Sequence, residues 1–389
     1  MKIAHIVPSS TYTDYWGYQD NLLPKYHSKL GHEATVIAMN QMHIGEKIVD
    51  TECSDYVLDD GVRVIRLDRK RVINSTVTEL KTRMRGVYEK LCELKPDFIF
   101  FHGLVSETIY DVIKYKKRVN PACVIVQDNH LDYNIGRKFN SLKDKVVRLL
   151  YRCQNRKSIK YVDKIYGVTP WRKKYAEDYF KIPEEKTDVL IMGADDEKID
   201  FANREQIRSS KRAEYGIKDD EFLIVTGGKI DKKKKIDTLM RACSQIQNVK
   251  LLVFGNVLDD VKSEFDSALN NSNNIIYIGW IDADKVYDYF FAADLVFFPG
   301  QHSVLWEQAC ASKVPCVFGK WVGMDHVNNG GNSDFVENIT EASLREKINE
   351  LHFTAKYFEM KSISESEATD VYLYSNIAKK SLECIMAKK

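Results

Sequence analysis

The stretch at residues 294–318, DLVFFPGQHSVLWEQACASKVPCVF, indicates the fold, because it passes from an apolar strand through a polar loop into a helix and a second apolar strand. The two expected strands, 295–298 and 316–318, are apolar throughout, as strands are when helices cover both faces of a sheet. Strand, helix and strand in this order predict parallel strands joined by a right-handed crossover. The loop would present backbone N–H groups at the start of the helix, where α/β proteins hold anions.

The same alternation of strands and helices runs through the whole chain in two series. Strands are expected at 3–7, 34–38, 62–67, 98–101, 123–126 and 164–168, then at 222–226, 249–254, 275–278, 295–298 and 316–318. One helix is expected near 76–94. We therefore predict an α/β protein with two doubly wound Rossmann-like domains, residues 1–190 and 191–365, that face a cleft. The last segment, 366–389, forms a helix that packs on one of the two domains, with the N-terminal one as the first candidate.

Length and composition limit the class of protein. The chain has 389 residues, of which 44% are hydrophobic, and this fits two globular domains rather than a disordered chain. No apolar run approaches the roughly 20 residues that a membrane span requires, and residues 1–4 lead into a strand without the layout of a signal peptide. We therefore expect a cytoplasmic protein. The eight cysteines lie mostly in apolar segments, which predicts buried, reduced thiols.

Residues 137–160 hold nine basic side chains and one acidic side chain. The apolar residues recur at helical spacing, which predicts a basic amphipathic helix; they are Phe139, Leu142, Val146, Leu149 and Cys153. Two interpretations stay open: the apolar stripe packs on the domain core beneath a solvated basic face, or the segment contacts an anionic membrane surface at its inner face. We expect no nucleic-acid partner, because no recognised binding module accompanies the charge.

A cluster of lysines directly follows the strand expected at 222–226. Gly227 and Gly228 allow a close backbone approach, and Lys229 and Lys234 lie in a lysine-rich turn at the carboxyl end of that strand. Lysines in this position suit a diphosphate. The alternative is a solvated, charged turn, and the position after a core strand favours the diphosphate.

Five segments, taken in order, resemble the retaining glycosyltransferases of family four, which have the GT-B fold. Residues 228–237, GKIDKKKKID, are similar to the family's Gly-Arg-Leu-(x)3-Lys-Gly motif. The other segments are the loop at Gly17 with 29–33 (KLGHE), 191–195 (IMGAD), 293–299 (ADLVFFP) and 305–309 (LWEQA). Together they cover nearly the whole chain.

The resemblance implies that the second domain binds a nucleotide sugar, UDP- or GDP-linked, and that the first binds a saccharide or lipid-linked acceptor. Lys229, where the family often has arginine, and Lys234 would neutralise the diphosphate and the charge that develops as it leaves. Glu307 matches the second glutamate of the family's paired-glutamate motif, which accepts hydrogen bonds from the ribose. The implied donor-binding residues are Gly17, Gly228, Lys229, Lys234, Gln301, His302, Ser303, Val304 and Glu307, with the helix start near Ser303 and Val304 facing the phosphates.

The chain departs from the family's pattern at Pro299, which stands eight residues before Glu307, where the family has its first glutamate. Gln301 or His302 could replace the hydrogen bonds of that glutamate to the donor sugar, but neither is a carboxylate. The identity of the donor sugar is therefore open.

In the first domain, polar side chains follow two expected strands at their carboxyl ends. His102 follows the strand 98–101, and Asp128 and His130 follow the strand 123–126. The resemblance implies a histidine after the second of these strands, and His130 matches that place approximately. Either His130 or Asp128 could orient or deprotonate the acceptor hydroxyl.

No metal and no cofactor are expected. Asp282 and Asp284 form an Asp-x-Asp triplet, which binds metal in a different glycosyltransferase fold. Here the triplet opens an expected helix at 285–291, so we interpret Asp282 as an N-cap and Asp284 as a first-turn acid.

These observations predict a retaining glycosyltransferase in cell-surface polysaccharide biosynthesis. A sugar-nucleotide epimerase of the same fold is one alternative, and it would convert its nucleotide sugar without an acceptor. A nucleotide-sugar-binding protein without catalytic activity is another, suggested by the missing first glutamate.

Overall fold

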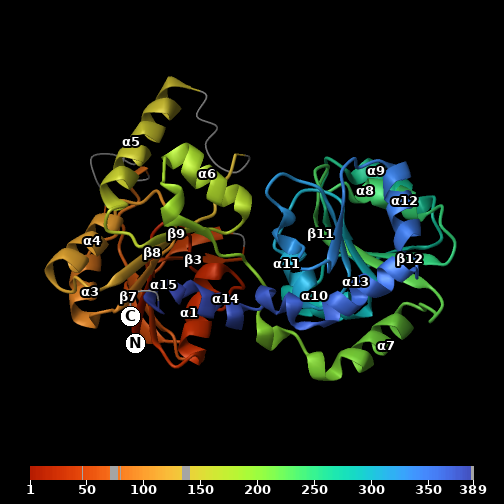
Figure 1. Ribbon diagram of the computed structural model, residues 1–389, viewed down its shortest axis with the longest axis horizontal. Helices are drawn as coiled ribbons and strands as arrows, with labels where there is room; N and C mark the ends of the chain where they lie inside the picture. The colour runs from red at the N-terminus through yellow and green to blue at the C-terminus, as the bar shows by residue number, and fades with distance from the viewer. Residues whose placement is uncertain (46, 71–77, 79, 134–140, 387–389) are drawn as a thin grey trace. The chain divides into compact units, whose positions relative to one another are not determined.

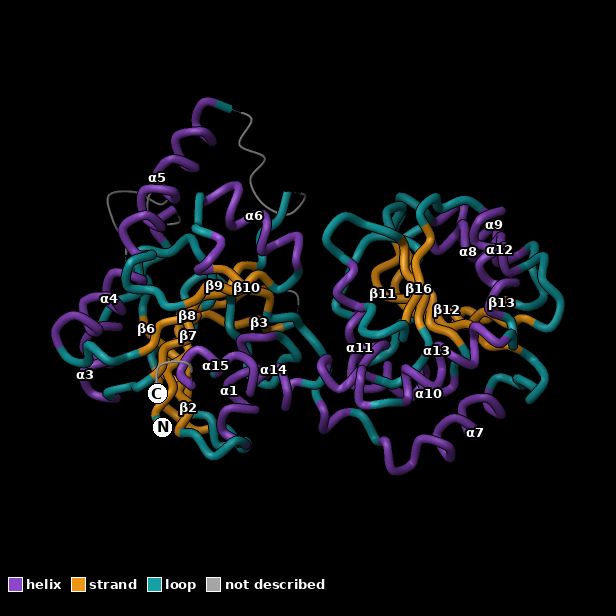
Figure 2. Tube along the Cα trace, in the orientation of Figure 1, coloured by secondary structure: helices purple, strands orange, loops and turns teal. Residues whose placement is uncertain are grey.

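The computed structural model describes residues 1–45, 47–70, 78, 80–133 and 141–386. The chain divides into two units: domain 1 comprises Met1–Ile191 and Ile377–Lys389, and domain 2 comprises Met192–Asn376. Each domain is built on a mainly parallel sheet with helices on both faces (Figures 1 and 2).

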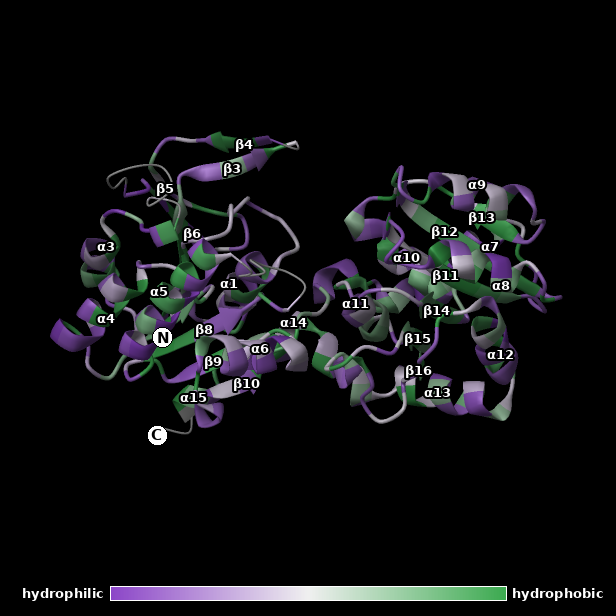
Figure 3. Cartoon of the chain, turned by 90° about the horizontal axis from the view of Figure 1, so that it is seen from above, coloured by the Kyte–Doolittle hydropathy of each residue, from purple (hydrophilic) through white to green (hydrophobic). Residues whose placement is uncertain are grey.

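The sheet of domain 1 has eight strands, and all neighbouring pairs are parallel except β5 with β6. Across the sheet the order is β10 (Thr187–Val189), β9 (Lys164–Gly167), β8 (Val124–Asn129), β7 (Phe98–Phe101), β1 (Lys2–Val7), β2 (Glu33–Met39), β6 (Arg63–Leu67) and β5 (Ser54–Val57). The strand order reverses between β1 and β7, which makes the carboxyl ends of these strands the expected ligand-binding edge. A separate antiparallel hairpin, β3 (Gln41–Ile44) and β4 (Lys47–Asp50), extends from the domain (Figure 3).

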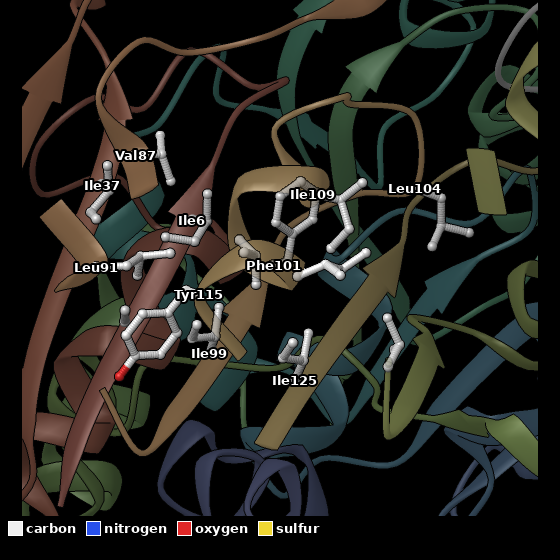
Figure 4. Close-up of a cluster of buried hydrophobic side chains, with 14 of the residues drawn as sticks. Ile6, Ile37, Val87, Leu91, Ile99, Phe101, Leu104, Ile109, Tyr115 and Ile125 are labelled. Carbon is white, nitrogen blue, oxygen red and sulfur yellow. The ribbon is translucent and has the colours of Figure 1, made fainter. Parts of the chain in front are cut away.

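Most helices of domain 1 bury apolar residues on this sheet, and α5 is the exception described below. They are α1 (Gln19–Lys29), α3 (Val87–Leu94), α4 (Ile109–Arg118), α5 (Leu142–Ser158), α6 (Pro170–Phe180) and α15 (Glu383–Met386), together with α14 (Tyr374–Ser381), within which the chain re-enters the domain. Ile6, Ile99 and Phe101 of the central strands pack against Leu91 of α3 and Ile109 of α4 in one buried cluster (Figure 4).

Domain 2 has six strands, and every neighbouring pair is parallel. Across the sheet the order is β13 (Ile275–Tyr277), β12 (Val249–Val257), β11 (Phe222–Ile230), β14 (Leu295–Phe298), β15 (Cys316–Gly319) and β16 (Ser333–Val336). Here the order reverses between β11 and β14. The α-helices are α7 (Arg204–Glu214), α8 (Ile236–Cys243), α9 (Lys262–Asn270), α10 (Val286–Ala292), α11 (Leu305–Ala311), α12 (Glu341–Leu351) and α13 (Ala355–Glu365).

Two of the strands that extend beyond their predicted ends contain candidate site residues in the extension. β11 continues through Gly228 and Lys229, and β8 continues through Asp128, so these residues lie within strands and not after them. The β11–β12 ladder continues because glycines let the two backbones approach: a Cβ at Gly255 would lie 1.8 Å from the carbonyl oxygen of Gly228.

The prediction of a single helix near 76–94 is wrong, because the helical conformation is interrupted before α3. Met84 forms an isolated bridge with Arg69, and Gly86 takes a left-handed conformation at the start of α3. In the first part of the expected helix, residues 76, 77 and 79 lie outside the described residues. None of the described helices is long and apolar enough to cross a membrane. The described cysteines form no disulfide, but Cys53 and Cys153 are exposed and not buried as expected.

Of the two interpretations of the basic helix, the one in which its apolar stripe packs on the core is wrong for the described residues, and the one in which it contacts a membrane stays a prediction. Leu142, Val146 and Leu149 are between 52% and 80% exposed, and Leu150 beside them is 58% exposed. Phe139 lies outside the described residues. Instead, Gln154 and Asn155 are buried and donate side-chain hydrogen bonds to the carbonyl oxygen of Leu104. The helix is thus held at its C-terminal half by amide contacts, and its N-terminal half projects from domain 1 (Figure 1).

Candidate functional site

In domain 2, the loops that follow β11 and β14 are joined at the point where the strand order reverses. The Nζ of Lys234 donates to the carbonyl oxygen of Gln301 at 2.7 Å, and the backbone N–H of Gln301 donates to the carbonyl oxygen of Lys233 at 3.1 Å. Gly300 lies between them, and a Cβ there would stand 2.3 Å from the same Lys233 oxygen. Only glycine allows the two loops to come this close.

The two lysines predicted to bind a diphosphate differ in their surroundings. Lys229, the last but one residue of β11, is exposed, whereas Lys234 is partly buried in the joined loops. Burial lowers the pKa of Lys234, and the negative charge of Asp231 partly opposes this. A partly desolvated ammonium group attracts an anion more strongly than an exposed one, so Lys234 is the better placed of the two to bind a phosphate.

Glu307 lies at the centre of a buried cluster that the sequence did not predict. Its Oε1 accepts a hydrogen bond from His302 Nε2 at 2.8 Å and another from His326 Nε2 at 2.8 Å. The Glu307 side chain is completely buried and each imidazole is 6% exposed. His326 lies in the 3-10 helix η5 (Asp325–Val327), and the Tyr372 hydroxyl donates to its carbonyl oxygen at 2.9 Å.

The two histidines keep this buried carboxyl group ionised. Burial alone would raise the pKa of Glu307, but the charges and hydrogen bonds of His302 and His326 lower it to about 2. Two acceptor atoms in the cluster, Glu307 Oε2 and His326 Nδ1, are buried and have no hydrogen-bond partner among the residues that the structure describes. Both could accept hydrogen bonds from the hydroxyl groups of a ligand if the cluster opened.

The role predicted for Glu307, contact with a ribose, stays a prediction, and the structure adds a condition to it. Because the carboxylate has no exposed surface, a ribose could reach it only after His302 or His326 moved. Ser303 and Val304 are partly exposed before α11, a helix of seven residues whose N-cap Val304 makes no side-chain capping bond.

The expected absence of metal also stays a prediction. One ligand atom from each of His302, Glu307 and His326 lies within 4.8 Å of the others, a donor set that suits zinc. The hydrogen bonds among the three side chains account for the same arrangement without an ion. Asp284 forms an ion pair with Lys198 at 2.6 Å, and Asp282 precedes the 3-10 helix η4 (Ala283–Lys285) without a side-chain capping bond.

In domain 1, the three predicted polar residues at the strand ends are in contact. Asp128 Oδ2 accepts from His102 Nδ1 at 2.8 Å and from His130 Nε2 at 3.3 Å, and Asp128 Oδ1 accepts from the backbone N–H of Gly103 at 2.7 Å. Burial alone would raise the pKa of Asp128, but the positive charge that His102 and His130 carry when protonated, and the hydrogen bonds that both donate, hold it well below its ordinary value.

Exposure separates the two candidates for contact with an acceptor. The Asp128 side chain is completely buried, whereas the His130 side chain is 44% exposed. Because a carboxylate only accepts hydrogen bonds, His130 carries its proton on Nε2 toward Asp128, which leaves Nδ1 as a basic nitrogen. Gly17 lies in the exposed loop between β1 and α1, where a Cβ would meet no atom within 4 Å.

Sequence analysis missed two residues that extend this group into the core. His5 lies on β1 and His27 on α1, and both are completely buried. A histidine in the middle of an apolar strand, AHIV at 4–7, is the signal that could have pointed to His5.

Residues 207–357 match the family model of the glycosyl transferases group 1. An uncharacterized glycosyltransferase of Methanocaldococcus jannaschii is 24% identical to the chain over 152 residues, which is 37% of this chain. The match spans 39% of the length of that relative. Both β11 and β14, with the loops that follow them, lie inside the matched family region.

Three solved structures resemble the chain over nearly its whole length. A glycosyltransferase from Rickettsia africae has a TM-score of 0.69 at 15% identity and covers 98% of this chain and 97% of its own. Anabaena HepE in complex with UDP-glucose has a TM-score of 0.65 at 16% identity, and UDP-GlcNAc 2-epimerase from Neisseria meningitidis has 0.60 at 12%; each covers 100% of both chains. These likenesses show the fold and confirm the predicted class, two Rossmann-like α/β domains of the GT-B type.

Proposed function

We propose that this protein is a glycosyltransferase that transfers a sugar from a nucleotide-sugar donor, with retention of configuration, to a saccharide or lipid-linked saccharide. The main observation in support is that the loops after β11 and β14 are joined by Lys234. These loops lie where the strand order reverses, and they fall inside the region that matches the glycosyltransferase family. Ligands of doubly wound sheets bind at this edge. We further propose that the product belongs to a cell-surface polysaccharide and that the protein acts in the cytoplasm.

The donor chemistry follows from charge. Lys234 and Lys229 supply two positive groups for a diphosphate, and the neighbouring acceptor atoms of the Glu307 cluster suit the hydroxyl groups of a ribose. The structural likeness to a UDP-glucose complex makes UDP the first nucleotide to test. Transfer needs no cofactor in this proposal, and Gln301 and His302 take the place of the missing first glutamate beside the donor sugar.

For the acceptor, we assign His130 the contact with the hydroxyl group that attacks. Its Nδ1 is basic and its side chain is exposed, while the buried Asp128 fixes the orientation of the ring. General-base assistance by a positioned histidine contributes roughly 10²–10⁴ to a rate. Asp128 is then a positioning residue.

The surface of α5 supports a lipid-linked acceptor. Leu142, Val146, Leu149 and Leu150 are exposed on a helix that also carries Lys143, Lys145, Arg148, Arg152, Arg156 and Lys157. Exposed apolar side chains among basic ones are the pattern of helices that lie in the surface of an anionic membrane. We propose that α5 binds the inner membrane face and brings domain 1 to a lipid-anchored acceptor.

An epimerase is the second candidate, because the likeness to UDP-GlcNAc 2-epimerase shows that the fold does not separate the two activities. The family match over 207–357 favours the transferase. A binding protein without turnover is the third candidate.

The deciding experiment is proton NMR of the purified protein with a panel of sugar nucleotides, followed with and without a membrane lipid extract. Loss of one anomeric signal only with the extract supports the transferase and identifies the donor. Conversion of one nucleotide sugar into another without the extract supports the epimerase and contradicts the proposal. If nothing is consumed, saturation transfer in the same tube shows whether any donor binds.

A further inference from the structure

A continuous line of hydrogen bonds crosses the core of domain 1 and joins five elements. From Asp128 at the end of β8 it runs to His102 after β7 (2.8 Å), then to His5 on β1 (3.2 Å) and to His27 on α1 (3.0 Å). From His27 Nε2 it reaches the hydroxyl of Ser381 on α14 at 2.8 Å. Four of these five side chains are completely buried, and that of His102 is 6% exposed.

The carboxylate at one end determines the direction of every bond in the line. Asp128 only accepts, so His102 donates from Nδ1 and, when neutral, must accept at Nε2. His5 then donates from Nδ1 to His102 and accepts at Nε2 from His27 Nδ1. His27 Nε2 is finally left to accept from the hydroxyl of Ser381. All three imidazoles thus carry their proton on Nδ1, with each N–H directed toward Asp128.

We propose that His102, His5 and His27 form a hydrogen-bonded relay that holds Asp128 as an anion. Asp128 thereby keeps the exposed His130 in the orientation in which Nε2 donates to the carboxylate and Nδ1 is the basic nitrogen. The role of His130 in this statement rests on the proposed function; the relay itself does not. His5 and His27 are positioning residues, because they act on His130 only through His102 and Asp128.

This line of hydrogen bonds requires neutral imidazoles, and burial favours the neutral form of a histidine. Burial, together with the neighbouring His27 and His102, places the pKa of His5 well below its ordinary value. Burial lowers the pKa of His27 to about 3, and the carbonyl oxygen of Ala378, which would accept from the protonated ring, partly opposes this. The other ionisable groups that act on the relay are His32, which acts on His27, and Asp128, which acts on His5.

At the His27 end of the relay, two oxygen atoms lie within hydrogen-bond distance of Nε2. A second arrangement of the protons in the relay is therefore available. His27 Nε2 lies 2.8 Å from Ser381 Oγ and 3.3 Å from the carbonyl oxygen of Ala378. If His102 took up one proton at Nε2, its new N–H would point to His5 Nδ1, and the protons of His5 and His27 would each move to Nε2. His27 would then donate to Ala378, and Ser381 already has that oxygen as an alternative acceptor at 2.7 Å. In this state His102 is a cation, and it competes with His130 for the charge of Asp128.

The first test uses the wild-type protein and does not depend on activity. Two-bond proton–nitrogen correlation spectra of ¹⁵N-histidine-labelled protein at pH 7.5 report which ring nitrogen carries the proton. We expect His5, His27 and His102 all to be protonated on Nδ1 and His130 on Nε2. Protonation of His5 or His27 on Nε2 at this pH would overturn the relay, whether or not the protein transfers a sugar.

The second test separates a relay from a merely structural cluster. His5→Leu removes the donor to His102, whereas His5→Asn keeps a donor near the position of Nδ1. With Nε2 of His102 left free in His5→Leu, the acid limb of the pH profile of kcat/KM should move up by about one pH unit, a tenfold loss at pH 6, with little change at pH 8.5. His5→Asn should restore most of the profile. Equal loss at every pH in both variants would assign His5 a structural role and contradict the proposal. Correct tautomers in a protein without sugar transfer would leave the relay intact and reject the proposed function instead.

Discussion

The ammonium group of Lys234 donates a 2.7 Å hydrogen bond to the carbonyl oxygen of Gln301, so the lysine that we propose as a diphosphate ligand also joins the loops that follow β11 and β14. The next nearest carbonyl oxygen, that of His302, lies 3.5 Å from the same nitrogen. The loop that carries the proposed sugar-binding residues is therefore positioned by the same lysine that we propose to neutralise the leaving group.

Lys234→Ala should reduce kcat by about 10²–10³, as removal of a group that stabilises developing charge does. Its cost in stability should be only about 1 kcal/mol, for one hydrogen bond lost to Gln301. Steady-state kinetics and urea unfolding measure the two effects. Lys233→Ala, an exposed lysine one residue away, is the matched control and should change neither. A loss of stability that accounts for the whole loss of activity would make Lys234 a structural residue.

Glu307→Gln tests the ribose contact. We expect UDP binding to weaken by roughly 1–3 kcal/mol, because a charged hydrogen bond is lost. Calorimetric titration with UDP and with 2′-deoxy-UDP, in wild type and variant, isolates the sugar hydroxyl. The wild type should prefer UDP and the variant should lose most of that preference. An unchanged preference means that Glu307 only orients His302 and His326.

His130→Gln should reduce kcat/KM by about 10²-fold and leave the fold intact, because the side chain is 44% exposed and the loss is that of a general base. Thermal unfolding provides the control measurement. Full activity in His130→Gln would remove His130 from the reaction and leave Asp128 with a structural role.

Buried His27 should make domain 1 less stable in acid. Its folded pKa of about 3 lies below the unfolded value of 6.5, so the unfolded chain binds a proton that the folded domain does not. Stability is therefore complete above about pH 6.5 and falls as the pH drops toward 3, by about 2 kcal/mol at pH 5. Hydrogen exchange of the β1 amides at pH 7.5 and 5, corrected for intrinsic rates, measures this difference. His27→Gln should reduce the difference between the two pH values, whereas His43→Gln, on the β3 hairpin, should preserve it.

The exposed face of α5 predicts binding to lipid vesicles. Wild-type protein should bind vesicles that contain anionic phospholipid, bind neutral vesicles weakly, and dissociate as salt is added. Replacing Leu149 and Leu150 by glutamine should weaken binding about tenfold. Phe358→Gln removes an equally exposed apolar side chain on α13 of domain 2 and should have no effect. Binding that survives the double substitution would move the contact elsewhere.

Apolar periodicity predicted the strands at the centre of both sheets, because those strands are buried on both faces and each is apolar through most of its length. Apolar periodicity gave no correct prediction where tertiary contacts determine how an element packs. The apolar stripe of α5 left a packed face and a membrane contact open. The helix is attached by Val147, Tyr151 and the two amides of Gln154 and Asn155, and no local pattern marks an amide that bonds to a distant carbonyl oxygen. Edge strands such as β5 and β16 are short and partly polar, and they lack that signal.

The order of strands in the sequence predicted part of the candidate site. Residues that follow β7, β11 and β14 could be named, because the carboxyl ends of neighbouring parallel strands share an edge. His326 and His27 could not be named, since each comes into contact through packing between elements far apart in the chain.

The return of the chain to domain 1 at Ile377 has a consequence for biosynthesis. Domain 2 is one uninterrupted segment, so its polypeptide is complete while the ribosome is still adding the segment that contains Ser381. Domain 1 must wait for that last segment before His27 acquires its hydroxyl partner, although its first 191 residues were made long before. Domain 1, whose synthesis begins before that of domain 2, can therefore complete its own contacts only after all of domain 2 has been made.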